Sequence, residues 1–111
     1  MPRRELFIGL MSGTSLDGVD AVLADFAAPR PELIAHAHHD FAPELHAELL
    51  RLNAPGDNEL HRAAVAAQHL ARSYASIVDD LLLHADIDAA QVRAIGAHGQ
   101  TVRHRPDAGY T

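Results

Sequence analysis

The longest regular pattern in the chain is an apolar stripe between Asn58 and Ala85. Its residues recur at intervals of three and four, the spacing that places side chains on one face of an α-helix. The stripe consists of Leu60, Ala63, Ala64, Ala67, Leu70, Ala71, Tyr74, Ile77, Val78, Leu81 and Leu82. Asn58 stands where a helix cap is expected. Such a helix needs a second layer to cover its apolar face, so the rest of the chain must supply one.

Short apolar segments on both sides of this helix predict that the second layer is a β-sheet. Residues 5–11 and 19–26 flank the turn-forming sequence SGTSLDG and are expected to pair as a β-hairpin. Residues 32–41 alternate in the manner of a third strand with one wetter face. After the long helix, residues 86–91 form a turn with a short helix, and residues 92–97 predict a fourth strand.

A shorter helix is expected at residues 44–52, with Pro43 at its first position. The order of elements is therefore three antiparallel strands, helices and then a further strand. This order predicts an α/β fold, the N-terminal part of an actin-like or ribonuclease-H-like ATPase domain. In such a domain the opening hairpin carries the nucleotide and the helices form a layer behind the sheet.

The composition excludes several classes of protein and of site. With 111 residues, the chain has the length of one domain or of part of one. The absence of cysteine excludes disulfides and thiolate metal sites. A net charge of −6 argues against a nucleic-acid partner. The apolar run Leu6–Met11 is shorter than the core of a signal peptide, and no run is long enough to cross a membrane. A cytoplasmic protein without a membrane partner is therefore expected.

The turn between the first two strands has the composition of a phosphate site. All nine basic residues of the chain are arginine, which excludes the lysine-dependent Walker phosphate loop. Glycines let backbone N–H groups approach a phosphate, hydroxyls add donors, and Asp17 or Asp20 could hold Mg²⁺ through water. The candidate residues are Ser12, Gly13, Thr14, Ser15, Leu16, Asp17, Gly18, Val19 and Asp20. The same residues are also good turn formers, and taken alone they support both interpretations about equally.

A second polar cluster follows the fourth expected strand, where α/β folds usually bind ligands. His98, Gln100 and Thr101 offer a ring nitrogen, an amide and a hydroxyl, which suit the hydroxyl groups of a sugar. Arg103 and Arg105 could meet a carboxylate or a phosphate. The alternative is a capped turn beside a solvated basic edge, and composition alone favours that alternative.

Three histidines close together raise the question of a metal site. His36 and His38 would share one face of the third strand, and His39 follows them directly. No third ligand is evident near that face, so solvated surface histidines are the expected outcome.

Two longer strings resemble a known family. Residues 8–20 (IGLMSGTSLDGVD) and 94–106 (AIGAHGQTVRHRP) resemble two motifs of the anhydro-N-acetylmuramic acid kinases, in the same order and at the expected distance. The resemblance spans the whole chain. It implies a two-domain ATPase of the superfamily that contains hexokinase and actin. Members use ATP to convert 1,6-anhydro-N-acetylmuramic acid and water into N-acetylmuramic acid 6-phosphate, which feeds peptidoglycan recycling in the bacterial cytoplasm.

The resemblance also implies roles for residues. Residues 13–20 would form the ATP phosphate loop. Met11 stands where sugar kinases of the superfamily usually carry an aspartate, so the metal-facing role would pass to one of the two aspartates of the loop. The sugar side of the cleft would include His98, Gln100 and Thr101.

Members of the family are much longer than this chain. Residues 1–111 would therefore be the N-terminal part of kinase domain I, without the rest of that domain or the second domain. The general base that activates water would lie beyond Thr111, so we expect the chain alone to be inactive. The family also suggests a homodimer for the intact enzyme. The alternative function is a non-catalytic nucleotide- or sugar-binding module of the same fold.

Overall fold

The computed structural model describes residues 3–13 and 15–111 of the chain. Its elements, in order, are β1 (Leu6–Met11), β2 (Gly18–Asp25), β3 (Glu32–Asp40), α1 (Pro43–Arg51), α2 (Glu59–Ala85), η1 (Ala89–Gln91), β4 (Val92–Ala97) and η2 (Pro106–Ala108). The predicted α/β fold class is confirmed, as is the order of three antiparallel strands, helices and a further strand. Pro43 is the first residue of α1, as its fixed φ angle favours.

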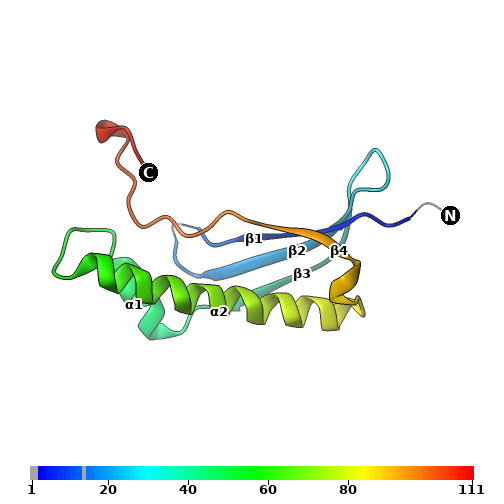
Figure 1. Cartoon of the computed structure of the whole chain (residues 1–111), viewed down its shortest axis with the longest axis horizontal. Helices are drawn as coiled ribbons and strands as arrows, with labels where there is room; N and C mark the ends of the chain where they lie inside the picture. Colours follow the sequence, from blue (N-terminus) through cyan, green and yellow to red (C-terminus); the bar gives the residue numbers. More distant parts are fainter. Residues whose placement is uncertain (1–2, 14) are drawn as a thin grey trace.

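The four strands form one mixed sheet in the order β3-β2-β1-β4 (Figure 1). β1 pairs antiparallel with β2, which pairs antiparallel with β3. β4 instead lies parallel to β1, because α1 and α2 carry the chain back across the sheet before β4 begins. The carboxyl ends of β1 and β4 therefore meet at the same edge of the sheet, which brings together the two polar segments that follow them.

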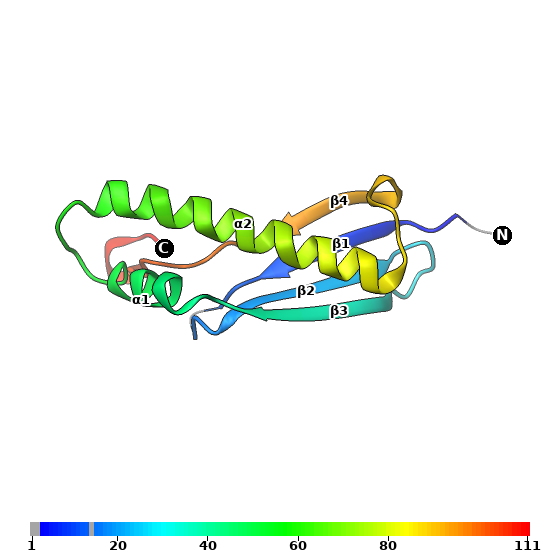
Figure 2. The same ribbon diagram turned by 90° about the horizontal axis from the view of Figure 1, so that it is seen from below.

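One face of the sheet packs on the helices and holds the core (Figure 2). Alternate residues of β1 and β2 point to this face, as the two-residue period of a strand requires. The C-terminal half of α2 lies against them with Ile77 and Leu81, which are 0% and 1% exposed. The buried strand residues are Leu6, Ile8, Leu10, Val19, Ala21 and Leu23.

The N-terminal half of α2 extends beyond the sheet, and there the predicted stripe is partly wrong (Figures 1 and 2). Leu60 is 85% exposed, because no strand lies beneath this part of the helix. The predicted cap at Asn58 is also wrong in its chemistry. Asn58 has the left-handed φ of 58° and makes no side-chain cap bond. Glu59 accepts the N–H of Gly56 instead, at 2.8 Å. The other predicted stripe residues that are exposed are Ala64, Ala67 and Ala71.

The opposite face of the sheet carries exposed apolar side chains. Phe7 and Phe26 pack edge to face there, with ring centroids 5.5 Å apart, beside the exposed Val22. No other element of residues 3–13 and 15–111 covers this face. In the same part of the chain, no helix combines the length and the apolar character needed to span a bilayer.

Two leucines of α2 make a matched pair that tests this packing. Leu81→Ala removes a side chain that is 1% exposed and should lower the free energy of unfolding by about 2–5 kcal/mol. Leu60→Ala, at 85% exposure, should change it by less than about 0.5 kcal/mol. Urea unfolding of the chain followed by circular dichroism measures both. Equal losses in the two variants would contradict the placement of α2.

Candidate functional site

The pairing of β1 with β4 continues past the ends of both strands. The N–H of His98 donates to the carbonyl of Leu10 at 2.9 Å. One residue further along β4's extension, the Ser12 hydroxyl donates to the carbonyl of Gly99 at 3.2 Å. We call residues 12–18 the first loop and residues 98–101 the second loop. These contacts bring the two predicted site segments side by side, although Ser12 and Gly99 are 87 positions apart in the sequence.

Ser12 anchors both loops to helix α2. Its side chain is 1% exposed, and its Oγ lies 2.8 Å from the hydroxyl oxygen of Tyr74. Because the single proton of Ser12 goes to the Gly99 carbonyl, the Tyr74 hydroxyl is the donor to Ser12. Sequence analysis placed Tyr74 only in the apolar stripe. The signal for its role was available, because a tyrosine in an apolar stripe carries a hydroxyl that needs a partner.

The first loop folds back onto the sheet through Leu16. This side chain is 3% exposed and its φ is +59°, while its N–H donates to the Gly13 carbonyl at 3.1 Å. Its own carbonyl accepts a bond from His46 Nδ1 at 2.8 Å. The buried leucine leaves Ser15 and Asp17 exposed at the surface of the loop. The predicted phosphate-site residue Thr14 lies outside the described residues.

The end of the first loop passes close to β3. A Cβ added at Gly18 would lie 2.0 Å from the His39 carbonyl oxygen, so only glycine fits there. The next residue, Val19, is 0% exposed and belongs to the core rather than to the loop surface. Gly18 therefore sets the course of the chain between the loop and β2.

The candidate metal residue Asp20 has a partner on the neighbouring strand. Its Oδ1 lies 2.8 Å from Nδ1 of His38, and Nε2 of His38 lies 2.9 Å from Oδ1 of Asp40. Both carboxylates accept, so the two hydrogen bonds favour the doubly protonated ring and raise the pKa of His38. The second oxygen of Asp20 takes no part in this bond, and Asp17 in the loop is exposed, as Asp20 is.

The three histidines of β3 do not form one cluster. His36 and His38 are exposed on the side away from the helices, as the strand prediction required for these two. His39 points to the helix side, where its Nε2 lies 2.8 Å from Oδ2 of Asp80 on α2. Within residues 3–13 and 15–111, no group of three or more His, Cys, Asp or Glu side chains is arranged to hold a metal ion. Any Mg²⁺ here would therefore take most of its ligands from phosphate and water, with one or two carboxylates.

The side chains of the second loop differ in their exposure to solvent and in their hydrogen bonds within the protein. His98 is exposed, and its Nδ1 lies 3.2 Å from the Gly99 carbonyl. Gln100 is half-buried and donates from Nε2 to the Gly13 and Thr101 carbonyls, at 3.1 and 3.0 Å. Its buried Oε1 has no hydrogen-bond partner among the described residues. Thr101 is half-buried beside it.

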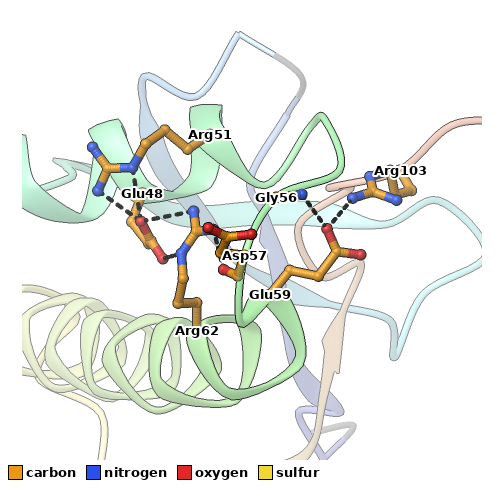
Figure 3. A network of polar contacts seen from close by, with 7 residues as sticks. All are labelled: Glu48, Arg51, Gly56, Asp57, Glu59, Arg62 and Arg103. Carbon is orange, nitrogen blue, oxygen red and sulfur yellow. Dashed lines mark hydrogen bonds and ion pairs between the residues drawn. The ribbon is translucent and has the colours of Figure 1, made fainter.

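The arginines that follow the second loop are held by carboxylates of the chain itself. Arg103 donates to Glu59 at 2.8 Å (Figure 3). It also donates to the Leu52 carbonyl at 3.1 Å, and the two bonds tie this segment to the turn between α1 and α2. Arg105 pairs with Asp107 at 2.8 Å. The sequence indicated that both arginines could meet a carboxylate or a phosphate, and each of them meets a carboxylate.

A second ion cluster in the same region fixes α1 on α2. Glu48 accepts bonds from Arg62 and Arg51, both at 2.7 Å (Figure 3). These two guanidinium groups, Arg62 first, lower the pKa of the Glu48 carboxyl. The pKa of Glu59 is lowered chiefly by the N–H of Gly56 and then by Arg103.

Comparison with known proteins agrees with the resemblance. The family model described as anhydro-N-acetylmuramic acid kinase matches residues 5–111. An anhydro-N-acetylmuramic acid kinase of Variovorax paradoxus is 61% identical over 96% of this chain and 30% of its own length. Relatives of the same name from Cupriavidus pinatubonensis and Bordetella pertussis are 55% and 58% identical, over 95% and 96% of this chain and 29% and 28% of their own lengths. The chain thus spans under a third of these relatives.

The Ser12–Tyr74 contact predicts a specific energetic coupling. Tyr74→Phe and Ser12→Ala should each lower the free energy of unfolding by about 1–3 kcal/mol, because each leaves a buried hydrogen bond unmade. The loss of unfolding free energy in the double variant should be smaller than the sum of the two single losses, by at least about 0.5 kcal/mol. Tyr110→Phe, in a ring that is 49% exposed, is the control. Additive losses in thermal or urea unfolding would contradict the contact.

The raised pKa of His38 predicts a dependence of stability on pH. Its two carboxylate partners stabilise the folded state while the ring is protonated, fully so below the unfolded pKa of about 6.5. This contribution is lost as the pH rises through the folded pKa. Wild-type stability minus that of His38→Gln should therefore shrink as the pH rises above about 6.5 and through the folded pKa. His69→Gln, an exposed site on α2, is the control, and a constant difference would contradict the bridge.

Proposed function

Because the chain belongs to the anhydro-N-acetylmuramic acid kinase family, we propose that it supplies one wall of the active site of such a kinase. The reaction would convert 1,6-anhydro-N-acetylmuramic acid, water and ATP into N-acetylmuramic acid 6-phosphate and ADP. The observation that carries the proposal is the junction of the first and second loops at the carboxyl ends of β1 and β4. An open α/β sheet binds ligands at this edge.

The first loop is proposed to hold the ATP phosphates. Its exposed surface, with Ser15 and Asp17, would face the nucleotide, while the buried Ser12, Leu16 and Val19 hold the loop in place from below. Backbone N–H groups of the loop would supply most of the donors, since the chain has no lysine. Of the nine residues predicted to bind the cofactor, the buried ones would support the loop and the others would face the nucleotide; the nine are Ser12, Gly13, Thr14, Ser15, Leu16, Asp17, Gly18, Val19 and Asp20.

Asp17 or Asp20 would hold Mg²⁺ through water. Their carboxylate oxygens are hard ligands of the kind this ion prefers, and both residues are exposed beside the loop. The ion would neutralise charge that builds up on the phosphates during transfer. One carboxylate oxygen of Asp20 accepts a hydrogen bond from His38, which leaves Asp20 fewer oxygens than Asp17 for a hydrated ion.

The second loop is proposed to face the sugar. His98 and Thr101 would meet its hydroxyl groups, and Gln100, predicted to join them, stands between them with its Nε2 bonded to two carbonyls. Phosphoryl transfer is mainly a matter of positioning and charge stabilisation from several sides. This chain supplies one of those sides, as the N-terminal part of kinase domain I. We place the general base and the second domain in the part of the relatives that this chain does not match.

The biological setting follows from the same family membership. We propose that the activity serves peptidoglycan recycling in the bacterial cytoplasm, in a homodimeric enzyme with ATP and the anhydro-sugar as its small-molecule substrates. The net charge of −6 offers nothing to attract a nucleic acid.

A chimera tests the proposal. The chain would replace the matching segment of the Variovorax paradoxus kinase, and 6-phosphate formation would be measured with ATP and the anhydro-sugar. The chimera should turn over, whereas the 111-residue chain alone should not. An inactive chimera, with ATP still bound by the chain, would favour a non-catalytic binding module. Turnover by the chain alone would contradict its role as one part of the site.

Asp17→Ala in the chimera tests the metal-facing role. Losing one electrostatic stabiliser should lower kcat/KM by about 100-fold. Asp79→Ala, at an exposed position of α2, is the control and should leave kcat/KM unchanged. Wild-type activity of Asp17→Ala would assign Asp17 a role in the turn only.

A further inference from the structure

Gln100 is oriented by two carbonyl groups. Its Nε2 lies 3.1 Å from the Gly13 oxygen and 3.0 Å from the Thr101 oxygen. A carbonyl oxygen can only accept, so the nitrogen of the amide must be the atom that faces both. The two protons of Nε2 are thus both engaged within the protein. Only the buried Oε1, which has no partner among the described residues, is left over.

The Gly13 carbonyl is the point on which the first loop closes. It accepts the N–H of Leu16 at 3.1 Å and the amide of Gln100 at 3.1 Å, using both of its lone pairs. Leu16 has a φ of +59°, an uncommon conformation for a residue with a side chain, so the turn needs contacts that hold it. Gln100 provides one such contact, from the other loop.

We propose that Gln100 acts as a positioning residue for the phosphate loop, fixing the Gly13 carbonyl and thereby the turn that would face the nucleotide. This inference rests on the proposed function of the first loop. Gln100 would then influence ATP rather than the sugar, although it stands in the segment assigned to the sugar. Donation from its amide to a sugar hydroxyl would require release of a loop carbonyl, which opposes that role.

Gln100→Glu separates the two roles. The change keeps the shape of the side chain but removes both N–H donors and places carboxylate oxygens against two carbonyls. In the chimera, we expect the KM for ATP to rise about 10-fold or more, the equivalent of one lost buried hydrogen bond. The KM for the sugar should stay within about 2-fold. Gln68→Glu, the same change at an exposed position of α2, is the control and should match the wild type.

Two results would overturn the proposal. One is a rise in the KM for the sugar as large as that for ATP or larger, and the other is no change in either KM. If Gln100→Glu is unfolded in the chimera, Gln100→Ala is measured instead, because it removes the donors without adding charge. The same expectations apply to it.

A second measurement keeps this inference distinct from the proposed function. If the wild-type chimera forms no 6-phosphate, the proposed function fails. Amide hydrogen exchange then tests directly whether Gln100 holds the first loop in place. Peptides that span residues 10–18 should exchange faster in Gln100→Glu than in the wild type, while peptides of α2 should not change. Unchanged exchange in residues 10–18 would overturn the inference.

Discussion

The parallel pairing of β1 with β4 is the constraint on which the rest of the site depends. The carboxyl ends of the two strands lie at the same end of the sheet because α1 and α2 return the chain across one face before β4 begins. The backbone hydrogen bond between His98 and Leu10 starts the residues that follow them from neighbouring positions. The side chains of Ser12 and Gln100 then extend the ladder where the strands have ended. The site is thus an extension of β-sheet pairing into two loops.

Helix α2 contributes to this junction as well as to the core. Ile77 and Leu81 bury apolar surface against the sheet, which fixes the height and the rotation of the helix. That rotation places the Tyr74 hydroxyl under Ser12, where it begins a chain of two hydrogen bonds that ends at Gly99. A change in the packing of α2 would therefore be felt in both loops. The core and the site are thus linked through Tyr74 and Ser12.

The sequence predicted the elements well, because the periods of strands and helices are local properties. It placed the candidate loops after β1 and β4, but the parallel pairing of these strands, which brings the loops together, was not predicted. It could not predict that Leu60 is exposed, since that depends on where the sheet ends beneath α2. Nor could it separate the roles within the loops. Ser12 and Gln100 are residue types that often bind ligands. Only the three-dimensional contacts show that they donate to the carbonyls of Gly99 and Gly13 instead.

The pairing of the arginines bears on how this surface could hold a phosphate. Arg103 and Arg105 follow the second loop directly, yet Glu59 and Asp107 hold them at 2.8 Å. In each pair the carboxylate offsets the positive charge of the guanidinium, and two of the guanidinium nitrogens donate to that carboxylate or to it and a neighbouring carbonyl. Neither arginine therefore presents its full charge and donor set to a phosphate. The chain has no lysine to take their place. Phosphate charge at the first loop would therefore be met by oriented backbone N–H groups and by a hydrated cation, so the exact course of the loop matters more than its side chains. Because binding would depend on the position of the backbone, a residue that holds the loop, as Gln100 is proposed to do, would affect the binding of the nucleotide.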